Sequence, residues 1–280
     1  MRLRVIGIVA ALVGLLGGTS SAFATPGSQD SPGHYYLALG DSLAYGFQLG
    51  KFLAALPNVD AAIFNTGYVD GFAAMVRAVQ DPLPTVNFGC PGETTVSYFA
   101  GCAFSQAGGP LHNGYAGSQE AAALAFLGAH HGQVGLITLD NGANDISPCL
   151  SSPDPACIPN ALAQVGANLN RALGELRAAA PGAEIIVMQY YDPYAAAFPA
   201  SVPGLLALNS VIAAAAAAHR AQLADAFAPI NLAQPQPATL CALTLFCTAL
   251  HDVHASDAGY AAIALQFWAA SSYSRSNRVN

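Results

Sequence analysis

The stretch YYLALGDSL at residues 35–43 gives the clearest indication of the fold. Its five leading apolar residues, 35–39, are typical of a strand buried on both faces of a parallel sheet. Gly40-Asp41-Ser42 then turns the strand into a loop. A serine at this position can expose its hydroxyl at the carboxyl end of the sheet while its backbone N–H points into the same space, as a nucleophile and an oxyanion donor require. The same residues are also ordinary turn chemistry, so their meaning depends on the rest of the chain.

Similar apolar runs recur along the chain, with helical stretches between them. The runs lie at 85–88, 134–139 and 184–189, with a weaker one at 222–227. The helix candidates are 69–79, 118–129, 159–179, 203–218 and 258–270. Strands alternating with helices predict an α/β fold of three layers, with a central parallel sheet and right-handed crossovers. Ligand sites in such folds lie at the carboxyl ends of the strands.

The N-terminus has the pattern of a secretory signal peptide. Arg2 and Arg4 precede the apolar residues 5–16, and Ala22-Phe23-Ala24 offers a small-x-small cleavage site. The alternative is a membrane anchor, but the apolar run is shorter than the ~20 residues that a bilayer span needs. We therefore expect a signal peptide at 1–24, a flexible segment at 25–33, a single domain at 34–272 and a flexible tail at 273–280.

The charge and composition of the expected mature chain narrow its partners. Without the leader the chain carries 7 basic and 16 acidic residues, a formal charge of −9, which argues against nucleic acid as a partner. The low charged fraction of 9% favours a folded domain with one large core. The alanine run at 213–218 ends in His219-Arg220 and suits a buried helix, so no stable membrane anchor is expected. We expect a secreted, soluble monomer.

The cysteines predict disulfide bonds. All six lie after the leader, and an even number in an exported chain is typical of a disulfide framework. They form three close-spaced couples, so we predict pairing between neighbours, with other connectivities left open. A zinc site is the alternative, but no couple has C-x2-C spacing and the histidines are scattered, so no metal ion is expected. The predicted pairs are Cys90 with Cys102, Cys149 with Cys157, and Cys241 with Cys247.

Residues suited to catalysis occur in three further segments. GCPGET at 89–94 contains Gly92, whose backbone can approach a ligand closely. NGAND at 141–145 places the side-chain amide of Asn144 at the same edge of the predicted sheet. HDVH at 251–254 brings imidazole and carboxylate groups together before the last helix. Each segment also has a structural explanation, as a turn, a helix cap or a loop.

Taken together, these segments resemble the GDSL lipase/esterase family, also called SGNH hydrolases, and a secreted bacterial member in particular. The matching blocks are GDSL at 40–43, the glycine of CPGET at 92, GAND at 142–145, and DVH followed by AGY between 252 and 260. Their order and spacing agree from about residue 35 to 270, nearly the whole expected mature chain. The resemblance implies a flavodoxin-like sheet that carries serine hydrolase chemistry without the G-x-S-x-G elbow.

The resemblance also implies the roles of individual residues. Ser42 is the implied nucleophile, and His254 is the implied general base that takes its proton. The oxyanion hole is implied to consist of the N–H groups of Ser42 and Gly92 and the amide of Asn144. A serine hydroxyl is a poor nucleophile without a base, and the developing negative charge needs donors already in place. No cofactor is expected.

One position departs from the family's commonest pattern, which has an aspartate three residues before the histidine. His251 occupies that position here, and Asp252 lies two residues before His254. We predict that Asp252 orients the imidazole, provided that the segment turns back on itself, and a backbone carbonyl is the alternative. Asp41 and Asp145 are interpreted as structural carboxylates that fix their loops.

The sequence therefore predicts a secreted, metal-independent serine esterase or lipase that cleaves small-molecule or lipid esters through an acyl-enzyme. Apolar residues in the first long insertion favour fatty acyl substrates, although core packing explains these residues about equally well. They are Phe47, Phe52, Leu53, Leu56, Ile63, Phe64 and Tyr68. Two alternatives stay open, a carbohydrate acetyl esterase of the same fold and a non-catalytic secreted binding protein.

Overall fold

Five parallel strands form a sheet at the centre of the part of the chain that the computed structural model describes, residues 35–276. Every predicted apolar run supplies one strand. The central strands β1 and β3 are almost entirely buried, which explains why their sequences are continuous apolar runs rather than alternations. The order across the sheet is β2-β1-β3-β4-β5. The strands are β1 (Tyr35–Gly40), β2 (Thr85–Asn87), β3 (Val134–Asp140), β4 (Glu184–Gln189) and β5 (Gln222–Asp225).

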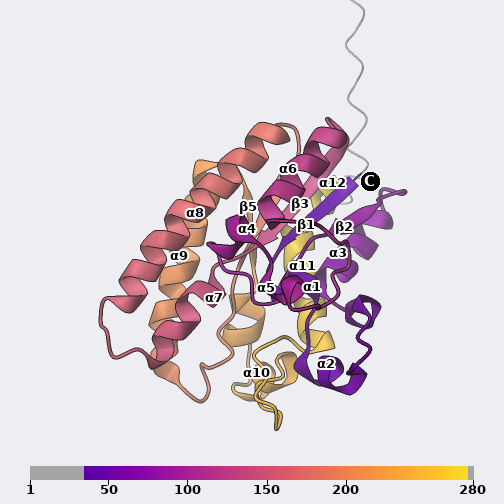
Figure 1. Cartoon of the computed structure of the whole chain (residues 1–280). Helices are drawn as coiled ribbons and strands as arrows, with labels where there is room; N and C mark the ends of the chain where they lie inside the picture. Colours follow the sequence, from indigo (N-terminus) through magenta and orange to yellow (C-terminus); the bar gives the residue numbers. More distant parts are fainter. Residues whose placement is uncertain (1–34, 277–280) are drawn as a thin grey trace, which may run out of the picture. The chain divides into compact units, whose positions relative to one another are not determined.

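Helices cover both faces of this sheet, as the three-layer prediction requires (Figure 1). On one face α8 packs against both α6 and α9, and on the other α3 packs against α11. These five long helices are α3 (Tyr68–Arg77), α6 (Gln119–Ala129), α8 (Cys157–Ala179), α9 (Val202–Ala218) and α11 (Asp257–Ala270).

Short helices and single turns occupy most of the loops. They include α1 (Ser42–Tyr45), α2 (Leu49–Ala55), η1 (Ala61–Phe64), α4 (Ser97–Ala100), α5 (Ala103–Gln106), α7 (Ala143–Ile146), η2 (Ser147–Ser151), η3 (Pro199–Ser201), η4 (Ala228–Leu232), α10 (Ala238–Leu243) and α12 (Ser272–Ser276). Because α1 and α7 begin directly after β1 and β3, they carry residues 42–45 and 143–146 at the carboxyl edge of the sheet.

Aromatic side chains join the two helices on one face of the sheet. Tyr68 of α3 stacks on Phe267 of α11 with ring centroids 4.4 Å apart, and both rings are fully buried. Burying a side chain of this size contributes about 1.5–3 kcal/mol.

The helix α9 is long and strongly apolar. Together with the preceding turn it spans Pro199–Ala218, a length and composition that would also cross a membrane. In the structure it packs against α8 and β4 and buries Leu205, Leu208 and Ile212. One face of α9 therefore belongs to the core, whereas Ala214, Ala217 and Ala218 of the run that was predicted to be buried are exposed.

The structure describes part of the predicted C-terminal tail but none of the predicted N-terminal segments. The predicted signal peptide at 1–24, the segment 25–33 and residues 277–280 lie outside the described residues. The predicted tail begins at 273, whereas the structure continues there as the helix α12. Ser274 is buried, and Ser272 hydrogen bonds through its N–H and its hydroxyl to Glu184 of β4. The domain therefore extends past the predicted boundary at 272.

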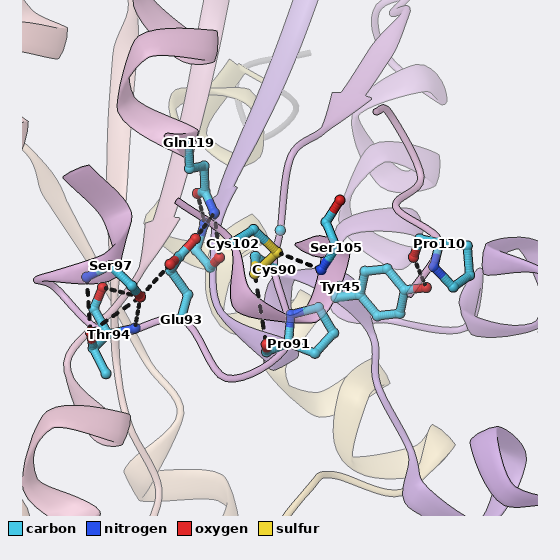
Figure 2. The surroundings of a disulfide bond; sticks show 12 residues. Tyr45, Cys90, Pro91, Glu93, Thr94, Ser97, Cys102, Ser105, Pro110 and Gln119 are labelled. Carbon is cyan, nitrogen blue, oxygen red and sulfur yellow. Dashed lines mark hydrogen bonds between the residues drawn. A yellow bond between two sulfur atoms is a disulfide. The ribbon is translucent and has the colours of Figure 1, made fainter. Parts of the chain in front are cut away.

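Three disulfide bonds join neighbouring cysteines, in the pairing predicted from the spacing. Cys90–Cys102 ties the loop after β2 to the start of α5, and Figure 2 shows it beside Glu93. Cys149–Cys157 joins η2 to the first residue of α8. Cys241–Cys247 joins α10 to the loop that follows it. All six cysteine sulfur atoms are used in disulfides, so none of them is a free thiolate that could bind zinc.

Candidate active site

Ser42 stands at the first position of α1, directly after β1. Asp41 caps this short helix, and its carboxylate accepts a hydrogen bond of 2.8 Å from the Leu43 N–H. The preceding Gly40 has a φ of +139°, and a Cβ there would overlap the carboxylate of Asp140. Only glycine fits this position, and it sets the sharp turn that presents the serine.

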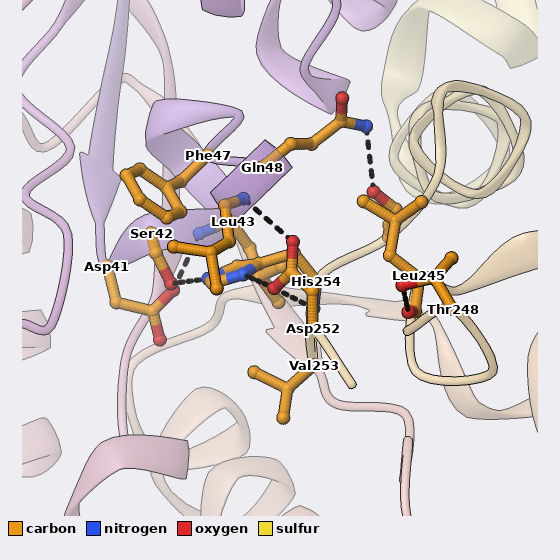
Figure 3. Close-up of polar contacts among 12 residues, drawn as sticks. Asp41, Ser42, Leu43, Phe47, Gln48, Leu245, Thr248, Asp252, Val253 and His254 are labelled. Atoms are coloured by element: carbon orange, nitrogen blue, oxygen red, sulfur yellow. Dashed lines mark hydrogen bonds and ion pairs between the residues drawn. The ribbon is translucent and has the colours of Figure 1, made fainter. Parts of the chain in front are cut away.

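His254 contacts the serine from a distant part of the chain. Its Nε2 lies 2.9 Å from the Ser42 Oγ, and its Nδ1 hydrogen bonds to Asp252, as Figure 3 shows. Because a carboxylate can only accept, Nδ1 carries the proton. Nε2 is therefore free to accept the proton of the Ser42 hydroxyl, which is the tautomer that a general base needs.

The geometry distinguishes Asp252 from its neighbour His251. Asp252 is buried, and its second oxygen accepts a 2.7 Å bond from the Leu49 N–H. Burial alone would raise its pKa, but the hydrogen bonds and charge of His254 outweigh it and hold the pKa below its usual value. His251 is exposed, and its ring bonds to the Phe246 carbonyl instead. His251 has a left-handed backbone, φ +46°, directly before Asp252.

Asn144 and Gly92 lie at the ends of the strands on either side of β1. The Asn144 Nδ2 donates a 2.9 Å bond to the Glu93 carbonyl, which leaves its second hydrogen free to point into the cavity beside Ser42. Gly92 has a φ of +80°, and nothing lies within 4 Å of the position that a Cβ would take. Within residues 35–276 no hydrogen bond uses the N–H of Ser42 or Gly92. The N–H groups of Ser42 and Gly92 and one Asn144 amide hydrogen are thus unused within residues 35–276.

Glu93 and Gln119 form a buried pair that connects the turn before Ser42 with the loop that contains Gly92. No role was predicted for either residue from the sequence. The Gln119 amide bonds both the N–H and the carbonyl of Gly40, at 2.6 and 2.9 Å, and donates to the Glu93 carboxylate at 3.2 Å (Figure 2). Glu93 also accepts a short hydrogen bond from Ser97. Burial, reinforced by the nearby charge of Asp41, raises the pKa of Glu93 to about 7.

A second buried carboxylate, Asp140 at the end of β3, was also missed. It accepts hydrogen bonds from the Tyr68 hydroxyl at 3.0 Å and from the Ala44 N–H at 3.1 Å. Burial raises the pKa of Asp140, and the proximity of Asp41 raises it further. The Tyr190 hydroxyl donates to Asp41 at 2.7 Å. The carboxylates of Asp41 and Asp140 therefore hold the turn that carries Ser42 in place.

The interpretation of Asp41 and Asp145 as loop-fixing carboxylates agrees with their contacts. Asp145 accepts bonds from the Thr95 N–H at 2.9 Å and the Thr95 hydroxyl at 2.7 Å, which connects the loop after β3 with the loop after β2. Neither carboxylate contacts the Ser42 hydroxyl or the His254 ring through a hydrogen bond within the described residues.

The cavity beside Ser42 is not lined by the residues that the sequence analysis favoured. Its volume is about 120 Å³, and much of its lining comes from the segments that come after β3 and β4 in the chain. Most residues of the first insertion pack instead into a small second core around Tyr45 and Phe64, which agrees with the core-packing alternative. Tyr68 belongs to the main core, and Leu53 and Leu56 are exposed. Phe47 lies beside His254, with the centroids of the two rings 5.0 Å apart.

Comparison with known proteins adds a family and a set of related folds. A model of the GDSL-like lipase/acylhydrolase family matches residues 38–262. None of the curated proteins compared with the chain matches its sequence.

Among solved structures, the chain is similar to an acetylxylan esterase from Geobacillus stearothermophilus, with 19% identity and a TM-score of 0.56 over 85% of this chain and 94% of that one. It is similar to a GDSL-like lipase from Parabacteroides merdae, with 13% identity and a TM-score of 0.57 over 85% and 95% of the two chains. It is also similar to the lipase Lip_vut3 from a goat rumen metagenome, with 16% identity and a TM-score of 0.53 over 84% and 96%. At these identities the likeness shows a common fold.

Proposed function

The chain belongs to the GDSL-like lipase/acylhydrolase family and is a carboxylic ester hydrolase, and we propose that it works through an acyl-enzyme on Ser42. The observation that carries the proposal is the hydrogen-bonded series from the Ser42 Oγ through His254 to Asp252. In this series the base can take the serine proton, and a carboxylate supports the charge that the ring then acquires.

In the first half-reaction the Ser42 Oγ attacks the ester carbonyl carbon while the His254 Nε2 takes its proton. The carbonyl oxygen becomes an oxyanion, which accepts hydrogen bonds from the N–H groups of Ser42 and Gly92 and from the Asn144 amide. When the tetrahedral intermediate collapses, His254 returns the proton to the leaving alcohol. The acyl group stays bound to Ser42 as an ester.

The second half-reaction repeats these steps with water. His254 takes a proton from a water molecule that attacks the acyl carbon, and the same donors hold the second oxyanion. Collapse of this intermediate returns the proton to Ser42 and releases the carboxylic acid. No metal ion or cofactor enters either half-reaction.

The test is covalent labelling combined with hydrolysis of p-nitrophenyl butanoate. A fluorophosphonate probe should label Ser42, identified by peptide mass spectrometry, and Ser42→Ala should abolish hydrolysis while the far-ultraviolet circular dichroism stays unchanged. Ser210→Ala is the matched control, because Ser210 is an exposed serine on α9 that bonds only its own helix. Labelling of another serine, or an active Ser42→Ala protein, would overturn the proposal.

A carbohydrate acetyl esterase is the second candidate, because the chain shares its fold with the acetylxylan esterase named above. Acetylated xylan should therefore be assayed beside the p-nitrophenyl esters. Release of acetate from xylan without hydrolysis of the simple esters would favour this candidate.

We also propose that the protein acts after export, as a monomer and without a membrane anchor. The leader pattern of residues 1–24 supports export, and the three disulfides agree with an oxidising compartment. Export predicts that the N-terminus of the protein recovered outside the cytoplasm is close to Thr25.

A further inference from the structure

The cavity beside Ser42 is bounded by segments that meet only in the folded protein. α7 and η2 form one wall, the residues that follow β4 form a second, and the first turns of α8 and α9 also contribute lining residues. Its large apolar lining residues include Ile146, Leu150, Ile158, Tyr190, Tyr191 and Leu205.

Most polar side chains in these walls are bonded within the protein; among the described residues, one Asn144 amide hydrogen and the Tyr194 hydroxyl are not. The Tyr191 hydroxyl donates to the Val253 carbonyl at 2.8 Å, and the Tyr190 hydroxyl donates to Asp41. The Asp192 carboxylate accepts bonds from a neighbouring N–H and a serine hydroxyl. A sugar hydroxyl that entered the cavity would lose its hydrogen bonds to water and find few replacements. An alkyl group would lose nothing and would gain the free energy of apolar burial.

The half of the ester that best suits this cavity is the acyl half. The leaving alcohol must diffuse away from His254 before water can take its place, which requires an open path. The acyl group must instead stay in position on Ser42 between the two half-reactions. The cavity begins at Ser42 and is lined further along by residues of α8 and α9, so it can hold a group that is covalently attached to Ser42.

The volume limits the length of that group. An engineered apolar cavity of about 150 Å³ binds benzene, which has six carbon atoms. This cavity, at about 120 Å³, is slightly smaller. On the premise of the proposed function, we infer that the enzyme selects straight acyl groups of about four to six carbons, which fill the cavity between α7 and α9. Acetyl groups leave the cavity partly empty, and longer chains extend beyond it.

The first experiment measures kcat/KM for a p-nitrophenyl ester series from acetate to decanoate. Each buried methylene should raise kcat/KM about fourfold, so butanoate should exceed acetate by about 15-fold. Beyond about six carbons the rise should stop. A second series holds the acyl group as butanoate and lengthens the alcohol from methyl to hexyl, and here kcat/KM should change little.

Two pairs of variants test the position of the cavity. Leu205→Ala enlarges the far end and should move the optimum to acyl chains two or three carbons longer. Its control is Leu173→Ala, which removes the same side chain from a buried site on α8 that does not line the cavity. Gly204→Ala adds a methyl 3.3 Å from the Ile158 side chain and should shorten the optimum by about one carbon.

Gly166→Ala is the control for Gly204→Ala. It adds the same methyl at the same distance, 3.3 Å, from Val211, where α8 and α9 also meet but no cavity lies. Neither control should change the optimum, even if it lowers the melting temperature.

The outcomes separate this inference from the proposed function. Hydrolysis with acetate as the best substrate, a rise that continues through decanoate, or selectivity for the alcohol half would each overturn the inference and leave the acyl-enzyme proposal standing. An optimum that moves in Leu173→Ala as much as in Leu205→Ala would also overturn it. Failure to hydrolyse any ester, with no labelling of Ser42, would overturn both.

Discussion

Replacing Asp252 with asparagine tests whether its carboxylate orients the His254 ring for the proposed reaction, and the size of the side chain stays the same. The carboxylate accepts hydrogen bonds from the Leu49 N–H at 2.7 Å, from the His254 N–H at 3.2 Å and from the His254 Nδ1. The Leu49 N–H bonds one carboxylate oxygen, and the His254 N–H and Nδ1 bond the other. Asparagine has a single acceptor oxygen. If the asparagine oxygen stays with the Leu49 N–H, the amide hydrogens face the ring and force the proton from Nδ1 to Nε2. The ring then cannot accept the Ser42 proton.

The expected loss in kcat is about 10⁴-fold, the loss found for the equivalent change in a serine protease triad, which corresponds to about 5.5 kcal/mol of transition-state stabilisation. KM should stay nearly constant, because Asp252 does not line the cavity. The measurement is steady-state hydrolysis of p-nitrophenyl butanoate, with urea denaturation to verify that the variant is folded.

The matched control is His251→Gln, which changes the adjacent residue in the same loop. Its ring contacts only the Phe246 carbonyl among hydrogen-bond partners in residues 35–276, so kcat should stay within about twofold of the parent. If Asp252→Asn retains activity within about tenfold, the site operates as a dyad of Ser42 and His254, and our account of Asp252 is refuted.

Two further changes test other parts of the site. Asn144→Ala should lower kcat by about 10²–10³-fold with little change in KM, because its amide meets a charge that exists mainly in the transition state, and a change confined to KM would contradict this role. Glu93→Gln should flatten the dependence of stability on pH. The pKa of Glu93 is raised from 4.5 to about 7, so the native state holds the proton more tightly, and the resulting stability is fully present below pH 4.5 and is lost as the pH rises to 7. Urea denaturation at pH 4.5 and 7.5 should show a difference that is smaller in the variant by up to about 3 kcal/mol, and equal differences in both proteins would rule out this assignment.

The parts of the fold that follow from local patterns could be predicted from the sequence. The buried strands of a parallel sheet are continuous apolar runs, so residues 35–39 and 134–139 already indicated β1 and β3. The disulfide pairs were equally local, since their separations are 12, 8 and 6 residues. Ser42 and His254 were identified through the GDSL resemblance, and the structure places their side chains within hydrogen-bonding distance.

The supporting contacts could not be predicted, because they depend on how distant segments meet. Gln119 reads in the sequence as an ordinary residue near a helix start, yet its amide bonds Gly40, which lies 79 positions earlier. Glu93 follows the glycine of a recognisable block, but it is buried, and its carboxylate contacts Ser97 of α4 and Gln119 of α6. The cavity was misplaced for the same reason. The aromatic residues of the first insertion pack together, and the actual lining comes from loops after β3 and β4.

The hydrogen bond between Ser42 and His254 joins residues 212 positions apart. Contacts of such long range close a large loop of chain, and folding slows as they become more numerous. β1 can pair with β2 and β3 before α11 has docked on α3, but the imidazole reaches the serine only when the segment leading into α11 is in place. During refolding, hydrolytic activity should therefore return later than secondary structure. Its return reports that the N-terminal and C-terminal parts of the domain are in contact.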